Sequence, residues 1–193
     1  MDDGEETGAP VYVVSGLPRS GTSMLMRMLE AGGLAVLADG ARAADRDNPR
    51  GYYELDAIKG TAFDASWVRA AGGKAVKVIS YLLRYLPADL EYRVLFLRRE
   101  LDQVVRSQRT MLERLGQPVG ETDGEARRLL AEHLVDVEAW LETAAHVRRL
   151  GVSHARVLSD PRGESERIAR FLGRELDLDA MARAVEPALW RQR

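Results

Sequence analysis

Short apolar runs alternate along this chain with longer stretches in which apolar residues recur at helical spacing. Runs of strand length occupy residues 11–15, 34–38, 74–79, 93–97 and 155–158. The run that ends at Leu97 is continuously apolar in character, which is typical of a parallel strand buried on both faces. The alternation predicts an α/β fold, with a three-layer αβα arrangement around a central, mostly parallel sheet.

Helical spacing of apolar residues predicts helices over residues 21–31, 101–115, 164–172 and 179–190. The first ends at Gly32 and Gly33 and the third at Gly173, where the backbone can adopt left-handed angles. Thr122 and Glu125 have the spacing of a capping box, in which a hydroxyl and a carboxylate satisfy free backbone N–H groups. They predict the start of a further, long amphipathic helix.

The chain has 193 residues, of which 46% are hydrophobic and 30% are charged. This is enough for one domain with its own core, so residues 11–193 are expected to form a single domain. Residues 1–10 are acidic and are expected to be a disordered leader, because a signal peptide would be basic and then apolar. No later apolar run approaches the roughly 18 residues of a membrane span. We therefore expect a cytoplasmic protein without a membrane partner.

Composition also excludes several kinds of chemistry. The chain has no cysteine, which rules out disulfides, thiolate metal sites and cysteine nucleophiles. Its net charge of -2 argues against nucleic-acid binding as its main role.

The segment from residue 16 to 23, Gly-Leu-Pro-Arg-Ser-Gly-Thr-Ser, follows the first expected strand and opens the first expected helix. Gly16 and Gly21 allow a tight loop whose backbone N–H groups point inward. Thr22 and Ser23 add hydroxyl donors at a helix N-terminus, which already carries partial positive charge. The strand, the glycine spacing and the hydroxyls together predict a site for a phosphate-like anion.

This loop lacks the lysine with which a nucleoside-triphosphate loop contacts the β and γ phosphates, because Thr22 occupies that position. The strand at 93–97 is followed by Arg98 and Arg99, where such proteins use a carboxylate to hold magnesium. Cations therefore stand where a metal site needs anions. The sequence predicts an anion site built from protein cations, without a metal, which disfavours an ATP or GTP enzyme.

At three places the chain resembles the sulfotransferases that use 3′-phosphoadenosine 5′-phosphosulfate (PAPS). Residues 18–23, Pro-Arg-Ser-Gly-Thr-Ser, are similar to the 5′-phosphosulfate loop, in the arginine form known from tyrosylprotein sulfotransferases. Residues 94–99, followed by Ser107, are similar to the 3′-phosphate motif, in which a strand-end arginine and a serine eight positions later clamp the phosphate. Residues 157–161 and the Phe-Leu-Gly at 171–173 are similar to the family's late strand, turn and helix.

The resemblance implies a variant of the P-loop nucleotide kinase fold. It also implies transfer of a sulfuryl group from PAPS to a hydroxyl or amine, with 3′-phosphoadenosine 5′-phosphate (PAP) as the other product. The acceptor would be a small molecule, a sugar or a peptide, and no metal is implied. The residues expected to hold the donor are Arg19, Ser20, Gly21, Thr22, Ser23, Arg99 and Ser107.

The chain also departs from the family's pattern. Glu100 and Leu101 follow the strand-end arginine where the family has Asp or Asn and then Pro. No Gly-x-x-Gly-x-x-Lys segment near the C-terminus completes the 3′-phosphate site. The histidine base of cytosolic sulfotransferases is replaced by Ile79. The segments that usually enclose the acceptor are reduced to residues 38–72 and 116–150.

Sulfuryl transfer needs a fixed cation beside the oxygen that joins phosphorus to sulfur, because negative charge builds there as the bond breaks. Arg19, in the loop, is the first candidate for this role. Lys77 is the second, because it resembles the strand lysine that precedes the active site in cytosolic sulfotransferases.

The base that takes the acceptor proton is expected to be a carboxylate, since the histidine mechanism is not available. Glu54 is favoured because it lies beyond a turn and beside Tyr52 and Tyr53, which would line an acceptor pocket. Asp45 and Asp39 are the alternatives. Three histidines show no partner at a recognisable spacing and are expected to be structural, namely His133, His146 and His154.

Two other functions stay open at this point. A nucleoside or small-molecule kinase would share the fold and would bind ATP with magnesium. A non-catalytic module would bind PAP or PAPS and transfer nothing. The motifs rank no acceptor above the others and predict no oligomeric state.

Overall fold

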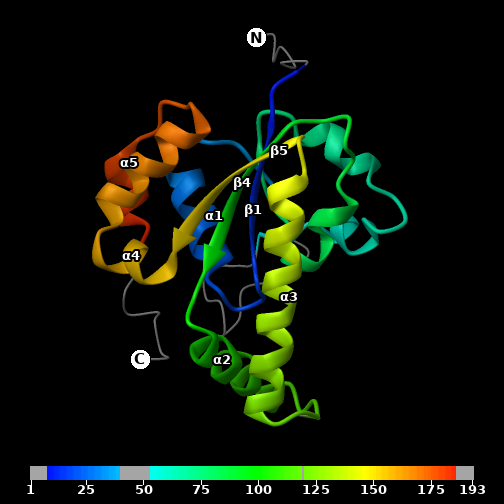
Figure 1. The fold of residues 1–193 in the computed structure, drawn as a ribbon. Coiled ribbons are helices and arrows are strands. Elements are labelled where there is room, and N and C mark those ends of the chain that lie inside the picture. Colours follow the sequence, from blue (N-terminus) through cyan, green and yellow to red (C-terminus); the bar gives the residue numbers. More distant parts are fainter. Residues whose placement is uncertain (1–7, 40–52, 119, 186–193) are drawn as a thin grey trace.

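A central sheet of five parallel strands organises the protein, seen in a computed structural model in which residues 8–39, 53–118 and 120–185 are described. The strands lie in the order β2-β3-β1-β4-β5 (Figure 1). Their bounds are β1 Val11–Gly16, β2 Val36–Leu37, β3 Ala75–Lys77, β4 Tyr92–Arg98 and β5 Val147–Ser153. Each neighbouring pair is parallel, which confirms the predicted α/β class.

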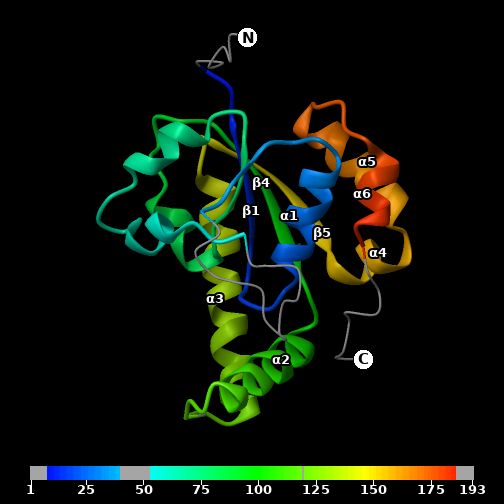
Figure 2. The same ribbon diagram turned by 180° about the vertical axis from the view of Figure 1, so that it is seen from behind.

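Helices cover both faces of the sheet, as the opposite views show (Figure 1, Figure 2). One face carries α1 Thr22–Ala31, α4 His154–Ser159, α5 Pro161–Leu172 and α6 Leu178–Arg183. The other face carries α3 Asp123–Thr143 and the 3-10 helices η1 Asp56–Gly60, η2 Ser66–Ala71 and η3 Ser80–Tyr85. Helix α2, Leu101–Arg114, lies below the sheet and packs against α3. The predicted three layers are present.

The central strand β1 is apolar along its length because it lies between these two helical layers. Tyr12 and Val14 pack into the core on the α1 side of the sheet. Val11 and Val13 pack into the core on the α3 side, which includes Val137. Successive side chains of a strand point to opposite faces, so a strand covered on both sides needs apolar residues at every position.

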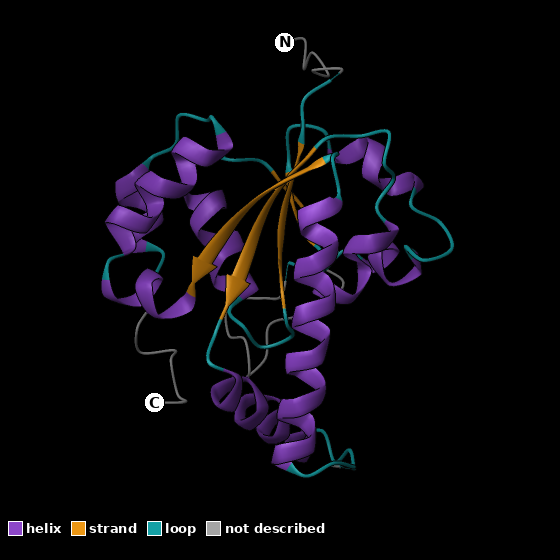
Figure 3. Ribbon diagram, in the orientation of Figure 1, coloured by secondary structure: helices purple, strands orange, loops and turns teal. Residues whose placement is uncertain are grey.

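Strand β1 is also where the connections of the sheet change direction. From β1 the chain runs to β2 and β3 on one side, and then crosses to β4 and β5 on the other. In open parallel sheets, ligands bind outside the carboxyl ends of the strands at such a switch point. Figure 3 shows the arrowheads of β4 and β5 at the same edge of the sheet. The turn from β1 into α1 lies at this edge, because Gly16 pairs with Leu97 near the end of β4.

Two predicted helix signals are confirmed in atomic detail. The side chain of Thr122 accepts a hydrogen bond from the backbone N–H of Glu125, whose carboxylate accepts one from the backbone N–H of Thr122 at 2.9 Å. This capping box opens α3. Gly173 ends α5 with a φ of 60°, in the left-handed region that favours glycine.

The prediction of a strand over residues 155–158 is wrong. These residues belong to α4, and the fifth strand is the segment before it, Val147–Ser153. It is an edge strand that pairs with β4 alone, and most of its residues are partly or fully exposed. It therefore lacks the apolar run that reveals a central strand. Ser153 caps the following helix by accepting a hydrogen bond from the backbone N–H of Arg156.

Other predicted elements differ at their ends. The strands at 34–38 and 74–79 are shorter than predicted, at Val36–Leu37 and Ala75–Lys77. Helix α5 starts at Pro161 because the side chain of Asp160 accepts from the backbone N–H of Gly163. The last predicted helix, 179–190, ends earlier than predicted, because α6 ends at Arg183. The rest of that prediction, beyond residue 185, lies outside the described residues, as does most of the predicted leader. In the described part of the chain, no helix has the length and apolarity to cross a membrane.

Candidate functional site

The loop between β1 and α1 depends on two glycines. Gly16 has a φ of 151°, and a Cβ built on it would stand 2.6 Å from the backbone oxygen of Leu97. Gly21 has a φ of 105° and is the N-cap of α1, and no side chain caps that end of the helix. The first N–H groups of a helix have no intrahelical partner. The loop therefore presents an uncapped helix N-terminus at the carboxyl edge of the sheet, which suits an anion.

Replacing Gly16 by alanine is expected to lower the free energy of unfolding by about 3 kcal/mol, since a clash with backbone adds to a left-handed φ. Gly33→Ala is the matched control, because Gly33 has a φ of 91° but nothing within 4 Å of its Cβ position. The control should lose only the backbone cost of about 1–2 kcal/mol. Urea unfolding measures both variants, and equal losses would show that β4 does not confine the loop.

Ser20 lies inside this loop with an unsatisfied hydroxyl. The residue is 1% exposed, and its Oγ has no hydrogen-bond partner among the described residues. This oxygen sits over Gly16, 2.7 Å from where a Cβ on that glycine would be. A buried hydroxyl without a partner costs about 1–3 kcal/mol. A polar ligand in the loop would remove that cost, so the hydroxyl fits the predicted anion site.

The loop is fastened to the end of β4 and to α2. Arg19 has a positive φ of 74°, and its Nε donates to Oγ of Ser107, which is buried, at 3.1 Å. Nη1 of Arg99 donates to the backbone oxygen of Arg19 at 3.0 Å. Nε2 of Gln108 donates to the backbone oxygen of Pro18 at 3.0 Å. The structure thus brings together Arg19, Arg99 and Ser107, which are far apart in the sequence.

Arg99 is half-buried among other cations. Its Nε donates to Oε1 of Gln103 at 3.0 Å. Burial, followed by the charges of Arg19 and Arg106, lowers the pKa of Arg99 to about 10. This pKa is still far above neutral, so the side chain keeps its charge. We call Arg19, Arg99 and Arg106 the arginine cluster; it lies beside the loop that carries Ser20.

The neighbouring Arg98 has a different role. Its Nη2 lies 2.6 Å from Oε1 of Glu138 on α3. Successive strand residues point to opposite faces, so one arginine at the end of β4 pairs with α3 and the next contacts the loop. Of these two arginines, Arg99 is the one that contacts the loop, through the backbone oxygen of Arg19.

Two predicted catalytic residues meet on the other side of β1. Lys77 is the last residue of β3, beside Val14 of β1, and its Nζ lies 3.6 Å from Oε1 of Glu54. The lysine side chain is 8% exposed and that of Glu54 is 30% exposed. The structure thus places a buried ammonium next to a carboxylate that reaches solvent, at the carboxyl edge of the sheet.

The two alternative bases differ from Glu54. The carboxylate of Asp39 accepts a hydrogen bond from the backbone N–H of Asp56. The backbone N–H of Asp39 donates to the backbone oxygen of Glu54. Asp45 and Tyr52 lie outside the described residues. The hydroxyl of Tyr53 donates to Oε2 of Glu30 on α1. Of these candidates, Glu54 is the one whose carboxylate is seen to pair with Lys77.

His154, which the sequence indicates as structural, lies against the loop. It is 6% exposed, and a Cβ on Gly21 would stand 2.7 Å from its ring. It follows β5 directly, one residue after Ser153, the partner of Arg98 in the sheet. Its place at the carboxyl edge could have been read from the sequence only with the right bounds for the fifth strand. With the strand predicted at 155–158, His154 would precede the strand and would not lie at its carboxyl end.

The stability of the protein should depend on His154 between pH 4 and 6.5. Burial, followed by the charge of Arg99, lowers the pKa of His154 from 6.5 to about 4. The unfolded chain therefore binds a proton in this range that the folded protein does not. Stability from the neutral imidazole is complete above pH 6.5 and is lost as the pH falls towards 4, by about 3 kcal/mol in all.

Urea unfolding of the wild type and of His154→Gln at pH 7 and pH 5 tests this dependence. The loss of stability between the two pH values should be about 2 kcal/mol smaller in the variant. Equal losses in both proteins would mean that His154 is protonated in the folded state already at pH 5.

A second histidine lies near the end of β3. Oγ of Ser80, which is 1% exposed, and Nε2 of His133 on α3 are 2.9 Å apart. The ring of His133 stacks on Tyr81 with 3.7 Å between the centroids. Burial lowers the pKa of His133, and the charge of Arg84 adds to this. These contacts join α3 to η3, which begins at Ser80, three residues after Lys77.

A scan of protein-family models gives no match for this chain, and no curated protein is similar to it in sequence. Among solved structures, it is similar to the sulfotransferase domain from the Synechococcus PCC 7002 olefin synthase, with 18% identity and a TM-score of 0.56. That match covers 93% of this chain and 78% of the other. The sulfotransferase domain from the curacin biosynthetic pathway matches with 13% identity and a TM-score of 0.51, over 94% and 76%. The chain therefore shares the α/β fold of these sulfotransferase domains.

Proposed function

We propose that this protein is a PAPS-dependent sulfotransferase, which transfers a sulfuryl group to a hydroxyl or amine of an acceptor. The arginine cluster carries this proposal. In it, Arg99 is half-buried, is affected by the charges of two other arginines, and donates to the backbone of the loop that carries the unsatisfied hydroxyl of Ser20. A ligand with several negative charges would stabilise the cations and bond the hydroxyl. PAPS is such a ligand, because its ribose carries a phosphosulfate at the 5′ position and a phosphate at the 3′ position.

The shared fold supports sulfuryl transfer as the kind of reaction. Both solved structures described above are sulfotransferase domains, and the match covers most of each chain. The candidate site lies at the carboxyl edge beside β1, where parallel sheets bind ligands.

The roles of the residues follow from their chemistry. The loop and Ser20 would bind the 5′-phosphosulfate, with Arg19 beside the oxygen that leaves with PAP. The bond between that oxygen and sulfur breaks as the acceptor oxygen or nitrogen bonds to sulfur from the opposite side. Glu54 would take the acceptor proton, and the charge of Lys77 would hold the carboxylate and stabilise the transferring group. PAP leaves, and the acceptor keeps the sulfuryl group.

A kinase with the same fold is the main competing function. It would need a site for magnesium and the γ-phosphate of ATP. Here β4 ends at Arg98 and is followed by Arg99, and the loop carries Thr22 in place of lysine. The positive charge around the loop therefore favours a donor whose phosphates are bound by arginines.

Calorimetric titration with PAP and with ATP, each with and without magnesium, separates the two functions. We expect PAP to bind without metal and more tightly than ATP. Magnesium-dependent binding of ATP with no binding of PAP would support the kinase. A protein that binds PAP is then incubated with PAPS and a mixture of sugars, phenols and amines. Formation of PAP that depends on an acceptor marks an enzyme; its absence across the mixture would indicate a binding module.

A further inference from the structure

Arg106 lies on α2 beside the positions that contact the loop and Arg99. Arg99 donates to Gln103, and positions three and four residues after Gln103 share its side of the helix. These positions are Arg106 and Ser107. Ser107 is buried and accepts from Arg19, whereas Arg106 is exposed. Arg106 therefore lies at the solvent side of the same cluster.

The other charges of this region are engaged elsewhere. Nη2 of Arg109 lies 2.5 Å from Oδ1 of Asp123, and Oδ1 of Asp102 lies 3.1 Å from Nε of Arg127. Both pairs link α2 to α3. Among the described residues, no carboxylate forms an ion pair with Arg106, and its charge acts on Arg99 instead. Repulsion between two arginines is unfavourable unless an anion is bound between them.

We propose that Arg106 is a specificity-determining residue, which binds the second phosphate of the nucleotide together with Arg99. The proposal rests on the function proposed above, in which the donor carries a 3′-phosphate. One guanidinium presents a planar fork to a phosphate, and two can share the charge of a dianion. Arg106 would thereby supply cationic contacts at this phosphate, for which the chain has no Gly-x-x-Gly-x-x-Lys segment.

Binding of two nucleotides that differ only in this phosphate tests the role. PAP and adenosine 5′-monophosphate are titrated into the wild type, Arg106→Ala and Arg106→Lys. We expect Arg106→Ala to weaken PAP binding about tenfold while adenosine 5′-monophosphate changes less than about twofold. Arg106→Lys should recover part of the loss because it keeps the charge without the fork. Arg170→Ala, which removes an exposed arginine on α5, is the control for net charge and should bind both nucleotides as the wild type does.

The outcomes separate this inference from the proposed function. If the wild type binds PAP but Arg106→Ala binds it equally well, the function stands and Arg106 is only a solvated side chain. If both nucleotides weaken by the same factor, Arg106 acts on the loop and not on the second phosphate. If the wild type does not bind PAP, the proposed function fails and this assignment fails with it.

Discussion

Replacing Arg99 by alanine is expected to weaken PAP binding about 100-fold while leaving the free energy of unfolding within about 1 kcal/mol of the wild type. The affinity falls because a half-buried arginine that contacts phosphate makes charge-assisted hydrogen bonds. Stability is kept because the variant loses hydrogen bonds to Gln103 and Arg19 but also loses repulsion from the other two arginines. Calorimetry and urea unfolding measure the two quantities.

Arg98→Ala is the matched control, because Arg98 is adjacent and ends the same strand. Its guanidinium pairs with Glu138 at 2.6 Å and is 53% exposed, so its loss should change PAP affinity little. An exposed ion pair contributes up to about 1 kcal/mol, so stability should fall slightly. If Arg98→Ala weakened PAP binding as much as Arg99→Ala, the assignment of the two strand-end arginines would be reversed. A large loss of stability in Arg99→Ala would show a structural role.

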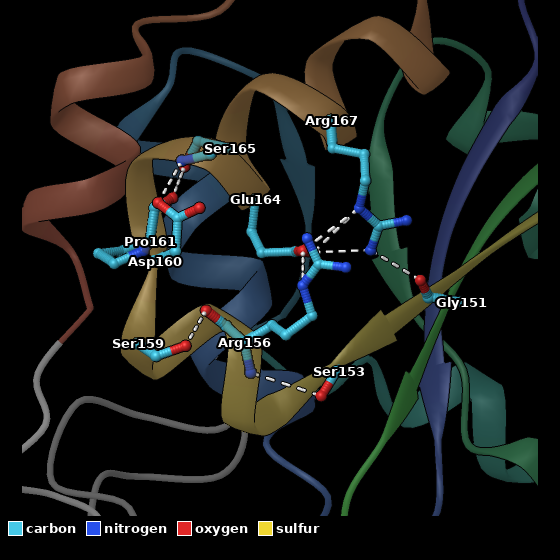
Figure 4. Close-up of polar contacts among 10 residues, drawn as sticks. Gly151, Ser153, Arg156, Ser159, Asp160, Pro161, Glu164, Ser165 and Arg167 are labelled. Atoms are coloured by element: carbon cyan, nitrogen blue, oxygen red, sulfur yellow. Dashed lines mark hydrogen bonds and ion pairs between the residues drawn. The ribbon is translucent and has the colours of Figure 1, made fainter.

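The largest effect on stability is expected when the buried Glu164 loses both of its arginines. Glu164 on α5 is 0% exposed, and its carboxylate lies 3.0 Å from Nε of Arg156 and 2.6 Å from Nη2 of Arg167 (Figure 4). Arg167 also donates to the backbone oxygen of Gly151 in β5. The three side chains thus join α4 and α5 to the edge strand.

The double variant Arg156→Ala/Arg167→Ala should lose about 3–5 kcal/mol, because a buried carboxylate without a cation is strongly unfavourable. Adding Glu164→Leu to it should recover much of the loss, since no charge is then buried. Arg170→Ala, which breaks an exposed pair with Glu166 on the same helix, should cost less than about 0.5 kcal/mol. Urea unfolding measures all three. If the double variant is no less stable than Arg170→Ala, the ion pairs at Glu164 are dispensable.

Central elements of the fold could be predicted from the sequence, because a strand such as β1 is buried on both faces and therefore reads as an apolar run. The edge strand β5 could not. Its arginines and its glycine are exposed, so β5 does not read as an apolar run. The more apolar segment 155–158, which was predicted as the strand, belongs to helix α4. The hydrophobicity of a segment indicates how deeply it is buried, and an edge strand is buried too little to be recognised in this way.

The same distinction holds for the site. The loop glycines and Ser20 follow from spacing, because a tight turn imposes them on neighbouring residues. The contact of Arg19 with Ser107 joins residues 88 positions apart, so local spacing could not predict it. The family resemblance pointed to both residues, and the crossing of the chain from β3 past β1 to β4 brings them together. His154 has no such signal, since it reaches the loop through the packing of elements far apart in sequence.

A crystal structure of the protein with PAP tests the central claim most directly. The account predicts one phosphate in the loop within hydrogen-bonding distance of Ser20 Oγ, and the other phosphate in contact with Arg99. A nucleotide bound away from the arginine cluster, with Ser20 still unsatisfied, would contradict the account.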